Sequence, residues 1–329
     1  MVKFNVLTDI PSLSGRVAIV TGGNRGVGFQ IVQQLANHGA KVYMASRSKS
    51  AAQKAIDLIE SQNPELKGAE RVVHLQLDLA SLKDTKNAAL QYLQSESRLD
   101  ILINNAAVMS HPYAKTAEGL EDNFAINHLG HFVFTCELLP ALIKTSKLPE
   151  ADVRVLTVAS SIHSIALAGG RFDNIEQVND YLTLEMFKDF IWGRYFRYAR
   201  SKLANILFAK RLQKEFDFKV TPILSISTDP GGVATETVLQ NMQAVFFIGP
   251  ILRWMTQRGA GTPLDGALSV LFAATAPEVR QNASQYAGAF IAPDAEIQLK
   301  RSNDSQSDEL AEKLWKVSKE ISEGILDEA

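Results

Sequence analysis

The chain has 329 residues, 46% of them hydrophobic, which is enough for one large α/β domain or two small ones. Lys and Arg (34) nearly balance Asp and Glu (36), and no basic stripe stands out, so no nucleic-acid partner is expected. A single cysteine, Cys136, excludes a disulfide within the chain and a Cys-based metal cluster, and it suits a reducing compartment such as the cytoplasm. Residues 1–9 lack a basic region followed by an apolar core, and no apolar run reaches about 18 residues. The sequence therefore predicts neither a signal peptide nor a transmembrane segment.

The first predicted elements are a strand over Val17–Val20, a glycine-rich loop over Thr21–Gly28 and an amphipathic helix that Gly39 ends. A strand, a glycine turn and a helix in this order open a dinucleotide-binding unit, in which the helix N-terminus faces a pyrophosphate. The loop spacing is G-x-x-x-G-x-G, which differs from the common G-x-G-x-x-G pattern, and ordinary loop glycines are the alternative. The predicted cofactor-binding residues here are Gly22, Asn24, Arg25, Gly26, Val27 and Gly28.

The second predicted strand, Lys41–Ala45, ends in Ser46 and Arg47. A site that prefers NAD usually has an acidic residue at this place, about 20 residues past the glycines, to bind the ribose 2′-hydroxyl. Here Arg47, with Arg25 in the loop, offers guanidinium groups that suit a 2′-phosphate. The sequence therefore favours NADP, and two solvated arginines are the alternative.

Two further strands are predicted to end at the same edge of the sheet, where such sheets bind ligands. Arg71–Leu77 ends in Asp78 and Leu79, and the Asp78 carboxylate either accepts a hydrogen bond from an adenine amino group or caps the next helix. Asp100–Ile103 ends in Asn104-Asn105-Ala106-Ala107, and the small and amide side chains there are expected to face the cofactor. The cofactor-binding candidates from these ends are Asp78, Leu79, Asn105 and Ala106.

The next predicted helix carries Asn127 as a polar residue in an apolar pattern. Its amide is either a satisfied core group or a group that holds a water near the chemistry. His128 and His131 lie three apart on this helix, but no third ligand has suitable spacing, so no metal site is expected.

The fifth predicted strand, Val153–Val158, leads to Ser160-Ser161 and a long aromatic connection over residues 162–197. A helix follows, on which Tyr198 and Lys202 lie four apart and therefore share one face. An ammonium beside a phenol favours the phenolate, so this pair could exchange a proton with an alcohol or carbonyl oxygen. An ordinary surface tyrosine and lysine are the alternative.

The sixth predicted strand, Val220–Ser227, ends in a loop where the nicotinamide half of a cofactor would rest. Its predicted cofactor-binding residues are Pro230, Gly231, Val233 and Thr235. Residues 244–255 are unusually apolar for a connection. They could line a substrate pocket, pack as core or a subunit contact, or attach the protein peripherally to an intracellular membrane; the oligomeric state stays open. A short strand over Ala289–Ile291 and an amphipathic helix over Asp308–Leu326 complete the predicted elements.

Strands that alternate with helices predict an α/β fold: one doubly wound Rossmann domain with a parallel sheet of about seven strands and helices on both faces. No repeat, linker or low-complexity tract is evident, so residues 1–329 are expected to form a single domain. Its cofactor half would span about 10–160, and its catalytic and substrate half about 161–329.

These motifs, in this order, resemble the short-chain dehydrogenase/reductase family over nearly the whole chain. The family's T-G-x-x-x-G-x-G loop corresponds to Thr21–Gly28, its N-N-A-G motif to residues 104–107 with Ala107 in place of glycine, and its Y-x-x-x-K pair to Tyr198 and Lys202. Asn-His-Leu-Gly-His-Phe (127–132) and Ser-Lys-Leu-Ala-Asn-Ile-Leu-Phe (201–208) are similar to the branch of retinol dehydrogenases and the WW-domain-containing oxidoreductase. Fungal relatives of that branch often act on secondary metabolites or aromatic carbonyls. Asp229 precedes Pro230 where histidine is frequent in this branch.

The resemblance implies an NADP(H)-dependent oxidoreductase that interconverts a hydrophobic ketone or aldehyde and its alcohol. Tyr198 would be the general acid or base, and Lys202 would lower the pKa of Tyr198 and bind the nicotinamide ribose. Ser161 would bind the substrate oxygen, and Asn127 would hold a water that links Lys202 to solvent. The alternative is an NADP-binding scaffold or redox sensor without turnover, against which the intact set of four residues argues.

Overall fold

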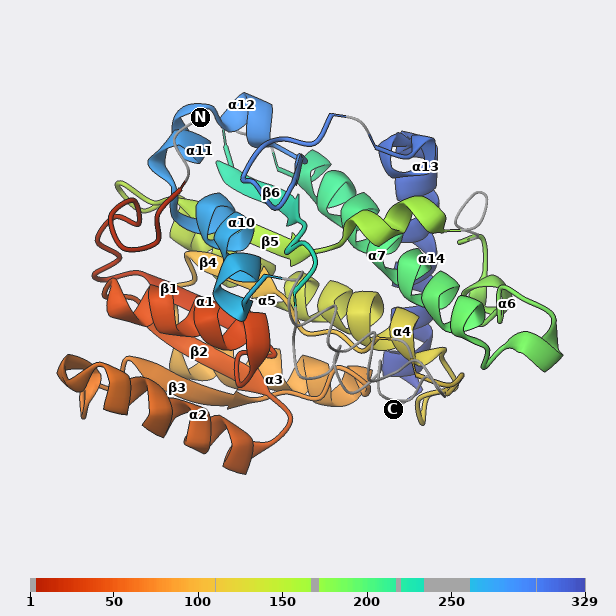
Figure 1. The fold of residues 1–329 in the computed structure, drawn as a ribbon, viewed down its shortest axis with the longest axis horizontal. Helices are drawn as coiled ribbons and strands as arrows, with labels where there is room; N and C mark the ends of the chain where they lie inside the picture. The colour runs from red at the N-terminus through yellow and green to blue at the C-terminus, as the bar shows by residue number, and fades with distance from the viewer. Residues whose placement is uncertain are drawn as a thin grey trace.

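The computed structural model describes residues 4–109, 111–166, 172–216, 220–233, 261–299 and 301–328. A seven-stranded sheet with the order β3-β2-β1-β4-β5-β6-β7 runs through the middle of the molecule (Figure 1). All six neighbouring pairs are parallel, so the predicted doubly wound α/β fold is confirmed. The strands are β1 (Val17–Thr21), β2 (Lys41–Ser46), β3 (Val72–Gln76), β4 (Ile101–Asn104), β5 (Val153–Val158), β6 (Ile223–Thr228) and β7 (Phe290–Ile291).

Helices connect the strands and cover both faces of the sheet (Figure 1). The α-helices are α1 (Gly26–Asn37), α2 (Lys49–Gln62), α3 (Leu82–Ser95), α4 (Asp122–Phe124), α5 (Gly130–Ser146), α6 (Ile175–Val178), α7 (Ile191–Lys214), α10 (Pro263–Thr275), α11 (Pro277–Gln281), α12 (Ala283–Tyr286), α13 (Asn303–Gln306) and α14 (Asp308–Asp327). Tighter 3₁₀ turns are η1 (Pro64–Leu66), η3 (Ser161–Ile165) and η4 (Glu185–Phe187), and a π-helical turn, η2 (Ala125–Leu129), joins α4 to α5.

Two apolar cores lie on opposite faces of the sheet because successive strand residues point to opposite sides. On β1, Val17 and Ile19 belong to the core beneath α3, α5, α7 and α14. Ala18 and Val20, the alternate residues, belong to the core beneath α1, α2 and α10. All five β1 residues are buried, as expected for a strand covered on both faces.

Helix α14, near the C-terminus, covers α7, the helix that carries Tyr198 and Lys202. Apolar residues of α14 pack against α7, and the Trp315 ring stacks on Phe208 with 6.1 Å between centroids. The Arg211 guanidinium lies 4.8 Å from the Trp315 ring centroid. The sequence predicted α14 as an amphipathic helix, and the structure confirms this.

Some predicted boundaries were wrong. Helix α7 begins at Ile191, two turns before Tyr198, and Gly193 in its first turn lies close to the carbonyls of 187 and 188. Asp78 does not cap the next helix, since Ser81 accepts the hydrogen bond from the backbone N–H of Asp84 at the start of α3.

One helical stretch in the described chain, Asp122–Ser146, is long and apolar enough to cross a membrane, with a mean hydropathy of 1.2. In this structure 67% of that window is buried inside the protein, where α5 packs against α3 and the sheet. A core helix of a globular protein has the same composition, so this stretch is weak evidence for a span.

Candidate active site

Helix α7 brings Tyr198 and Lys202 to one place at the carboxyl end of the sheet. The Lys202 Nζ atom lies 5.5 Å from the centroid of the Tyr198 ring. Lys202 is only 2% exposed, and it donates a 2.9 Å hydrogen bond to the Val158 carbonyl at the end of β5. Asn205, less than one turn further along α7, donates to the same carbonyl at 3.0 Å. The helix is thus fixed against the strand whose end leads to Ser161.

Burial dominates the ionisation of both groups. It lowers the pKa of the Lys202 ammonium to about 8, and the Asp229 carboxylate opposes that shift. Burial also raises the pKa of the Tyr198 phenol, with a further increase from the negative charge of Asp229. Burial has this effect because it penalises the charged phenolate. The role of Lys202 as the group that lowers the pKa of Tyr198 stays a prediction.

Ser161 begins η3 directly after β5, and η3 packs against α7. Its side chain is exposed, whereas its backbone N–H donates a 2.8 Å hydrogen bond to Asp229 Oδ2. Ser160 starts the turn by accepting a hydrogen bond from the N–H of Ile162. Ser161 is therefore exposed at the start of a turn that packs against α7, and its backbone is held by Asp229.

Asn127 lies in the π-helical turn η2 and is fully buried. Its Nδ2 atom donates to the Val108 carbonyl and to Ser201 Oγ, both at 2.9 Å, and its Oδ1 atom accepts from the Val108 N–H at 2.8 Å. Ser201 in turn donates to the Tyr198 carbonyl at 2.7 Å. The side-chain amide of Asn127 thus has all its hydrogen bonds made within the protein, which was one of the two alternatives. These bonds connect the segment after β4 to α7. A π-helical turn is a common feature of functional sites.

His131 joins this region to the glycine loop. Its Nδ1 atom lies 3.1 Å from the Asn127 carbonyl, which can only accept, so Nδ1 carries the proton and Nε2 accepts from Thr21 Oγ1 at 2.8 Å. Burial lowers the pKa of His131 to about 4, which keeps the ring neutral in this role. No group of three or more His, Cys, Asp or Glu side chains that could hold a metal ion occurs in the described parts of the chain.

The glycine loop is built for close backbone approach. A Cβ atom on Gly22, whose φ is +65°, would lie 3.0 Å from the Ala106 Cα, and one on Gly28 would lie 2.6 Å from Asn105 Nδ2. Asn105 and Ala106 in turn donate their backbone N–H groups to Thr21 Oγ1 at 2.9 Å. The loop therefore rests directly on the end of β4, so these predicted cofactor-binding residues lie together.

The start of α1 fits a phosphate-bearing cofactor. Helix α1 begins at Gly26. The side chain of its N-cap residue, Arg25, accepts no hydrogen bond from the first N–H groups of the helix. Oriented N–H groups and the helix dipole favour an anion at this point. The loop residues predicted to bind the cofactor are neighbours of these N–H groups along the chain: Asn24, Arg25 and Val27.

The end of β2 has no carboxylate in the place that selects NAD. Ser46 is buried there with an unpartnered Oγ atom, and Arg47 is exposed. Arg25 is exposed as well, and neither guanidinium forms an ion pair with another described residue. Both arginines are thus available to a group that binds beside the loop.

The turn after β6 lies near the start of α1. Gly231 has a φ of +73°, which favours glycine, and its N–H donates to Asp229 Oδ1 at 2.9 Å. A Cβ atom on Gly266 of α10 would lie 2.5 Å from a Val233 methyl carbon and 3.0 Å from one of Val27. Val233 and Val27, both predicted cofactor contacts, therefore both lie close to Gly266.

Of the remaining residues predicted to contact the cofactor, two lie at the end of β3, and one lies outside the part of the chain that the structure describes. Asp78 Oδ1 accepts a 3.0 Å hydrogen bond from the Ala80 N–H, and Leu79 packs its carbonyl against Gly130 of α5. Pro230 follows Asp229 and lies beneath α10. Thr235 and the apolar stretch 244–255 lie outside the described residues.

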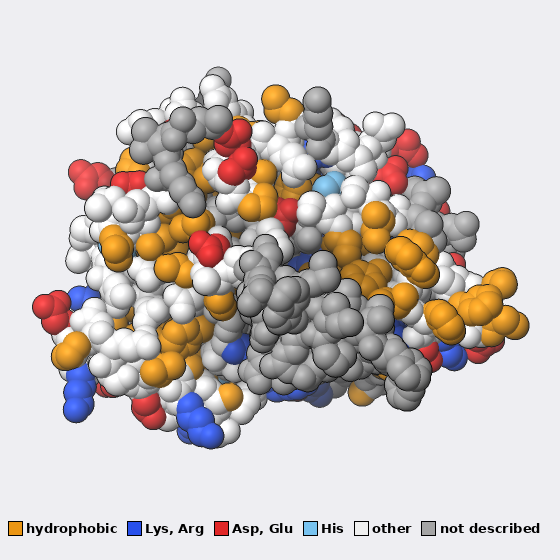
Figure 2. Space-filling model, viewed as in Figure 1, with side chains coloured by type: hydrophobic (Ala, Val, Ile, Leu, Met, Phe, Trp, Pro, Cys, Tyr) orange, Lys and Arg blue, Asp and Glu red, His pale blue; other side chains and the backbone are white. Residues whose placement is uncertain are grey.

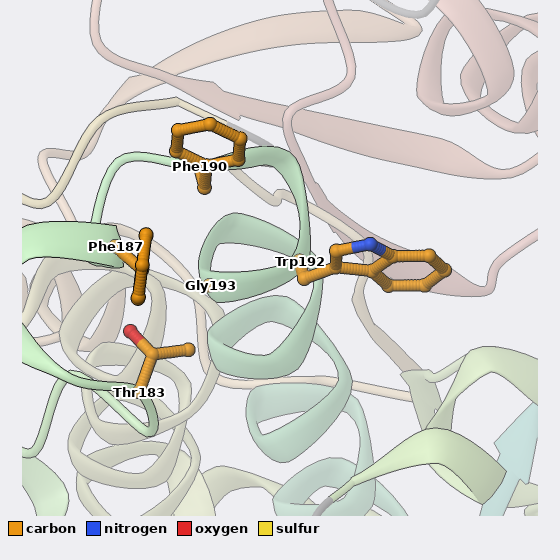
Figure 3. Close-up of a pocket in the computed structure, with 5 residues that line it drawn as sticks. All are labelled: Thr183, Phe187, Phe190, Trp192 and Gly193. Atoms are coloured by element: carbon orange, nitrogen blue, oxygen red, sulfur yellow. The ribbon is translucent and has the colours of Figure 1, made fainter.

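A cavity of about 270 Å³ lies at the start of α7, lined by Thr183, Phe187, Phe190, Trp192 and Gly193 (Figure 3). Phe187, Phe190 and Thr183 lie on one side of Gly193, and the Trp192 indole extends to the other (Figure 3). None of the four predicted catalytic residues lines this cavity, so it is not the place where the chemistry is expected.

Beside α7 lies a buried ionic cluster that the sequence did not reveal. The Glu121 carboxylate, fully buried, lies 3.5 Å from Arg197 Nε and 3.7 Å from Arg200 Nη2. Arg200 also donates to the carbonyls of Gln177 and Val178, which ties α6 to the helix of Tyr198. Asp229 and His131 were likewise not predicted as functional residues. The only feature of the sequence that could have pointed to these residues is the position of polar side chains at strand ends or within apolar helices.

Comparison with known proteins places the chain in a family. Residues 16–168 match the family described as short chain dehydrogenase. A short chain dehydrogenase/reductase of Colletotrichum higginsianum is 39% identical over 94% of this chain and 76% of its own length, and human retinol dehydrogenase 14 is 30% identical over 95% and 88%. The crystal structure of an uncharacterized protein from Mycobacterium paratuberculosis superposes with a TM-score of 0.68 at 27% identity, covering 98% of both chains. With its fold, motif order and relatives in agreement, this chain belongs to the short-chain dehydrogenase/reductase family.

Proposed function

We propose that this member of the family interconverts a hydrophobic ketone or aldehyde and its alcohol with NADP(H), through Tyr198, Lys202, Ser161 and Asn127. The observation that carries this proposal is the 5.5 Å approach of the buried Lys202 ammonium to the Tyr198 ring, beside the turn that presents Ser161. A phenol and an ammonium at one face of a helix are a proton-transfer pair, and the serine hydroxyl supplies a hydrogen bond to the oxygen that changes charge.

In the direction of reduction, a nicotinamide cofactor held by the glycine loop and Lys202 would supply the hydride for the carbonyl carbon. Tyr198 donates its phenolic proton to the carbonyl oxygen, which becomes the hydroxyl of the product. Ser161 donates a hydrogen bond to the same oxygen while its negative charge grows. Lys202 stabilises the phenolate that remains until a proton from solvent restores the phenol. Oxidation of the alcohol uses the same groups in the reverse order.

Asn127 is proposed to hold a water on the path that returns this proton. Both Nδ2 hydrogens are already donated, to Val108 and Ser201, so the side-chain NH2 group has no hydrogen left for this water. The backbone carbonyl of Asn127, which also accepts from the His131 ring, would be the group that binds this water.

The preference for NADP rests on the residues at the end of β2. Arg25 in the glycine loop and Arg47 after β2 are both exposed, and the end of β2 has no carboxylate of the kind that binds a ribose 2′-hydroxyl. A guanidinium matches the oxygens of a 2′-phosphate in a fork, whereas a 2′-hydroxyl would gain little from it.

A hydrophobic substrate is supported by the aromatic connection that leads into α7. The side chains of Leu184, Met186, Phe190 and Trp192 are between 63% and 78% exposed. Figure 2 shows apolar side chains gathered at the edge of the molecule where Figure 1 places α6. An exposed apolar cluster of this kind favours contact with lipophilic molecules, and it lies apart from the place where the chemistry is expected.

The test is a panel of lipophilic ketones, aldehydes and alcohols assayed with NADPH, NADH and their oxidised forms by nicotinamide absorbance. We expect turnover with at least one apolar carbonyl and a higher kcat/KM with NADPH than with NADH. Absence of turnover with either cofactor across the panel would reject the proposed activity. Turnover of sugars in preference to apolar carbonyls would reject the substrate class alone.

A further inference from the structure

Asp229 is a buried carboxylate that joins two parts of the candidate site. It follows β6 and is 1% exposed. Its Oδ2 atom accepts from the Ser161 N–H at 2.8 Å, and its Oδ1 atom accepts from the Gly231 N–H at 2.9 Å. One side chain thus holds both the turn that presents the serine and the glycine turn next to α1. These two turns follow different strands, β5 and β6.

The backbone of Asp229 is held as firmly as its side chain. Its N–H donates to the Ile291 carbonyl of β7 at 2.8 Å, and its carbonyl accepts from Ser269 Oγ of α10 at 2.7 Å. The carboxylate therefore has a fixed position relative to both neighbouring strands and to α10. A fixed acceptor can fix its donors, because a buried N–H that loses its partner costs free energy.

The charged groups that face Asp229 come from the two elements that carry the chemistry. From α7, its negative charge raises the pKa of both Lys202 and Tyr198. From η3, it raises the pKa of His163, which burial lowers more strongly and the positive charge of Arg301 lowers as well. No ion pair within 4.0 Å links Asp229 to any described cation, so its influence on Lys202 acts at longer range.

We propose that Asp229 is a positioning residue, which sets Ser161 and the Gly231 turn against the helix of Tyr198. This inference rests on the proposed function of the same site. A carboxylate is suited to the task because its two oxygens accept two N–H groups at once. An asparagine offers one acceptor and one donor, and the histidine that is frequent at this place in the resembled branch offers at most one acceptor.

The experiment compares Asp229→Asn with Asp100→Asn as a matched control. Asp100 is also a buried carboxylate that accepts a backbone N–H, from Val17 at 2.9 Å, but it lies before β4 at the amino end of the strands, whereas Asp229 lies at their carboxyl end. We expect Asp229→Asn to lower kcat about 10- to 100-fold, since misplacement by about 1 Å has an effect of this size. Asp100→Asn should lose stability and keep kcat within about threefold.

The pH profile of carbonyl reduction separates positioning from simple structural damage. Reduction needs a protonated Tyr198 and a charged Lys202, and loss of the Asp229 charge lowers the pKa of both groups. The loss of activity at high pH should therefore begin at lower pH in Asp229→Asn than in the wild type or in Asp100→Asn. An unchanged kcat and profile in Asp229→Asn, or an equal loss in both variants, would overturn the proposal.

Hydrogen exchange provides a test that needs no substrate. In Asp229→Asn, amides in peptides that contain Ser161 and Gly231 should exchange at least about tenfold faster, and Asp100→Asn should leave them unchanged. If the wild type reduces no carbonyl, the proposed function fails and this comparison still decides whether Asp229 anchors the two turns. If Asp229→Asn does not fold, Ser269→Ala, which frees the Asp229 carbonyl, should give a smaller change of the same kind.

Discussion

The ammonium of Lys202 faces the ring of Tyr198 from the next turn of α7, at 5.5 Å from its centroid. Both groups belong to a helix that is fixed to the end of β5 by Lys202 and Asn205 and to η2 by Ser201. The relative position of phenol and ammonium is therefore set by the packing of a long helix rather than by a loop. Such placement keeps reacting groups in register without a cost of ordering them at each turnover.

Replacement of Tyr198 by Phe should lower turnover by about 10²- to 10⁴-fold, because the proton donor is removed while the ring remains. The affinity for NADPH, measured by fluorescence titration, should persist. Tyr195→Phe is the matched control, since it removes a hydroxyl from the same helix less than one turn away.

Turnover that survives in Tyr198→Phe with any substrate would contradict the assignment of this residue as the acid. Equal losses in both tyrosine variants would point to damage of α7 rather than to chemistry. Full NADPH binding without turnover in the wild type would instead favour a redox sensor.

Arg47→Asp should weaken NADPH binding about 10- to 100-fold, which corresponds to the loss of one charge-assisted hydrogen bond to phosphate. NADH binding should change little, since its ribose has no 2′-phosphate. Lys54→Asp on the exposed face of α2 makes the same change of charge and serves as the control. Equal changes for both cofactors would show that Arg47 does not recognise the 2′-phosphate.

Glu121→Gln should destabilise the fold by about 3 kcal/mol or more, because Arg197 and Arg200 would stay buried without their counterion. Urea denaturation at pH 7 measures this change. Glu185→Gln, which breaks an exposed pair with Lys188 at 3.5 Å, should change the free energy of unfolding by less than about 1 kcal/mol. A similar small effect at both sites would mean that the buried cluster contributes no stability.

Acidification should destabilise the protein through His128. Burial lowers the pKa of His128 to about 3 from an ordinary value of 6.5, so between these values the unfolded chain binds a proton that the folded chain does not. Stability is then lost as pH falls, by up to about 1.4 kcal/mol per pH unit from this group. The His128→Leu/Ser318→Ala double variant removes both partners of a 2.8 Å hydrogen bond.

Between pH 7 and pH 5, this double variant should lose about 2 kcal/mol less stability than the wild type in urea unfolding. Ser318→Ala alone keeps His128 and should keep the full dependence on pH. If the double variant and the wild type have the same slope, His128 is not the group that titrates.

Local pattern was sufficient to predict most of the architecture. The apolar run at Val17–Val20, the glycine loop and the following helix are determined by neighbours in the sequence, and the structure has them as expected. The pairing of Tyr198 with Lys202 was predictable for the same reason, since helical spacing alone brings the two together. Strand ends were less accurate, as at β6, which begins at Ile223 rather than at Val220.

Contacts between distant segments were not predictable. The hydrogen bond from Ser161 to Asp229 joins residues 68 positions apart, and its existence depends on the register of β5 against β6. The burial of Glu121 between two arginines of α7 likewise depends on how a loop packs on a helix. The raised pKa of Tyr198 follows from burial, which a helical pattern does not measure.

The cover that α14 forms over α7 has a consequence for biosynthesis. Phe208 and its apolar neighbours on α7 meet Trp315 and the α14 stripe only after the ribosome has made the intervening residues. Until then the helix that holds Tyr198 has an exposed hydrophobic surface in the nascent chain. Chaperone capture during translation, and aggregation of chains truncated before α14, would follow from this order of synthesis.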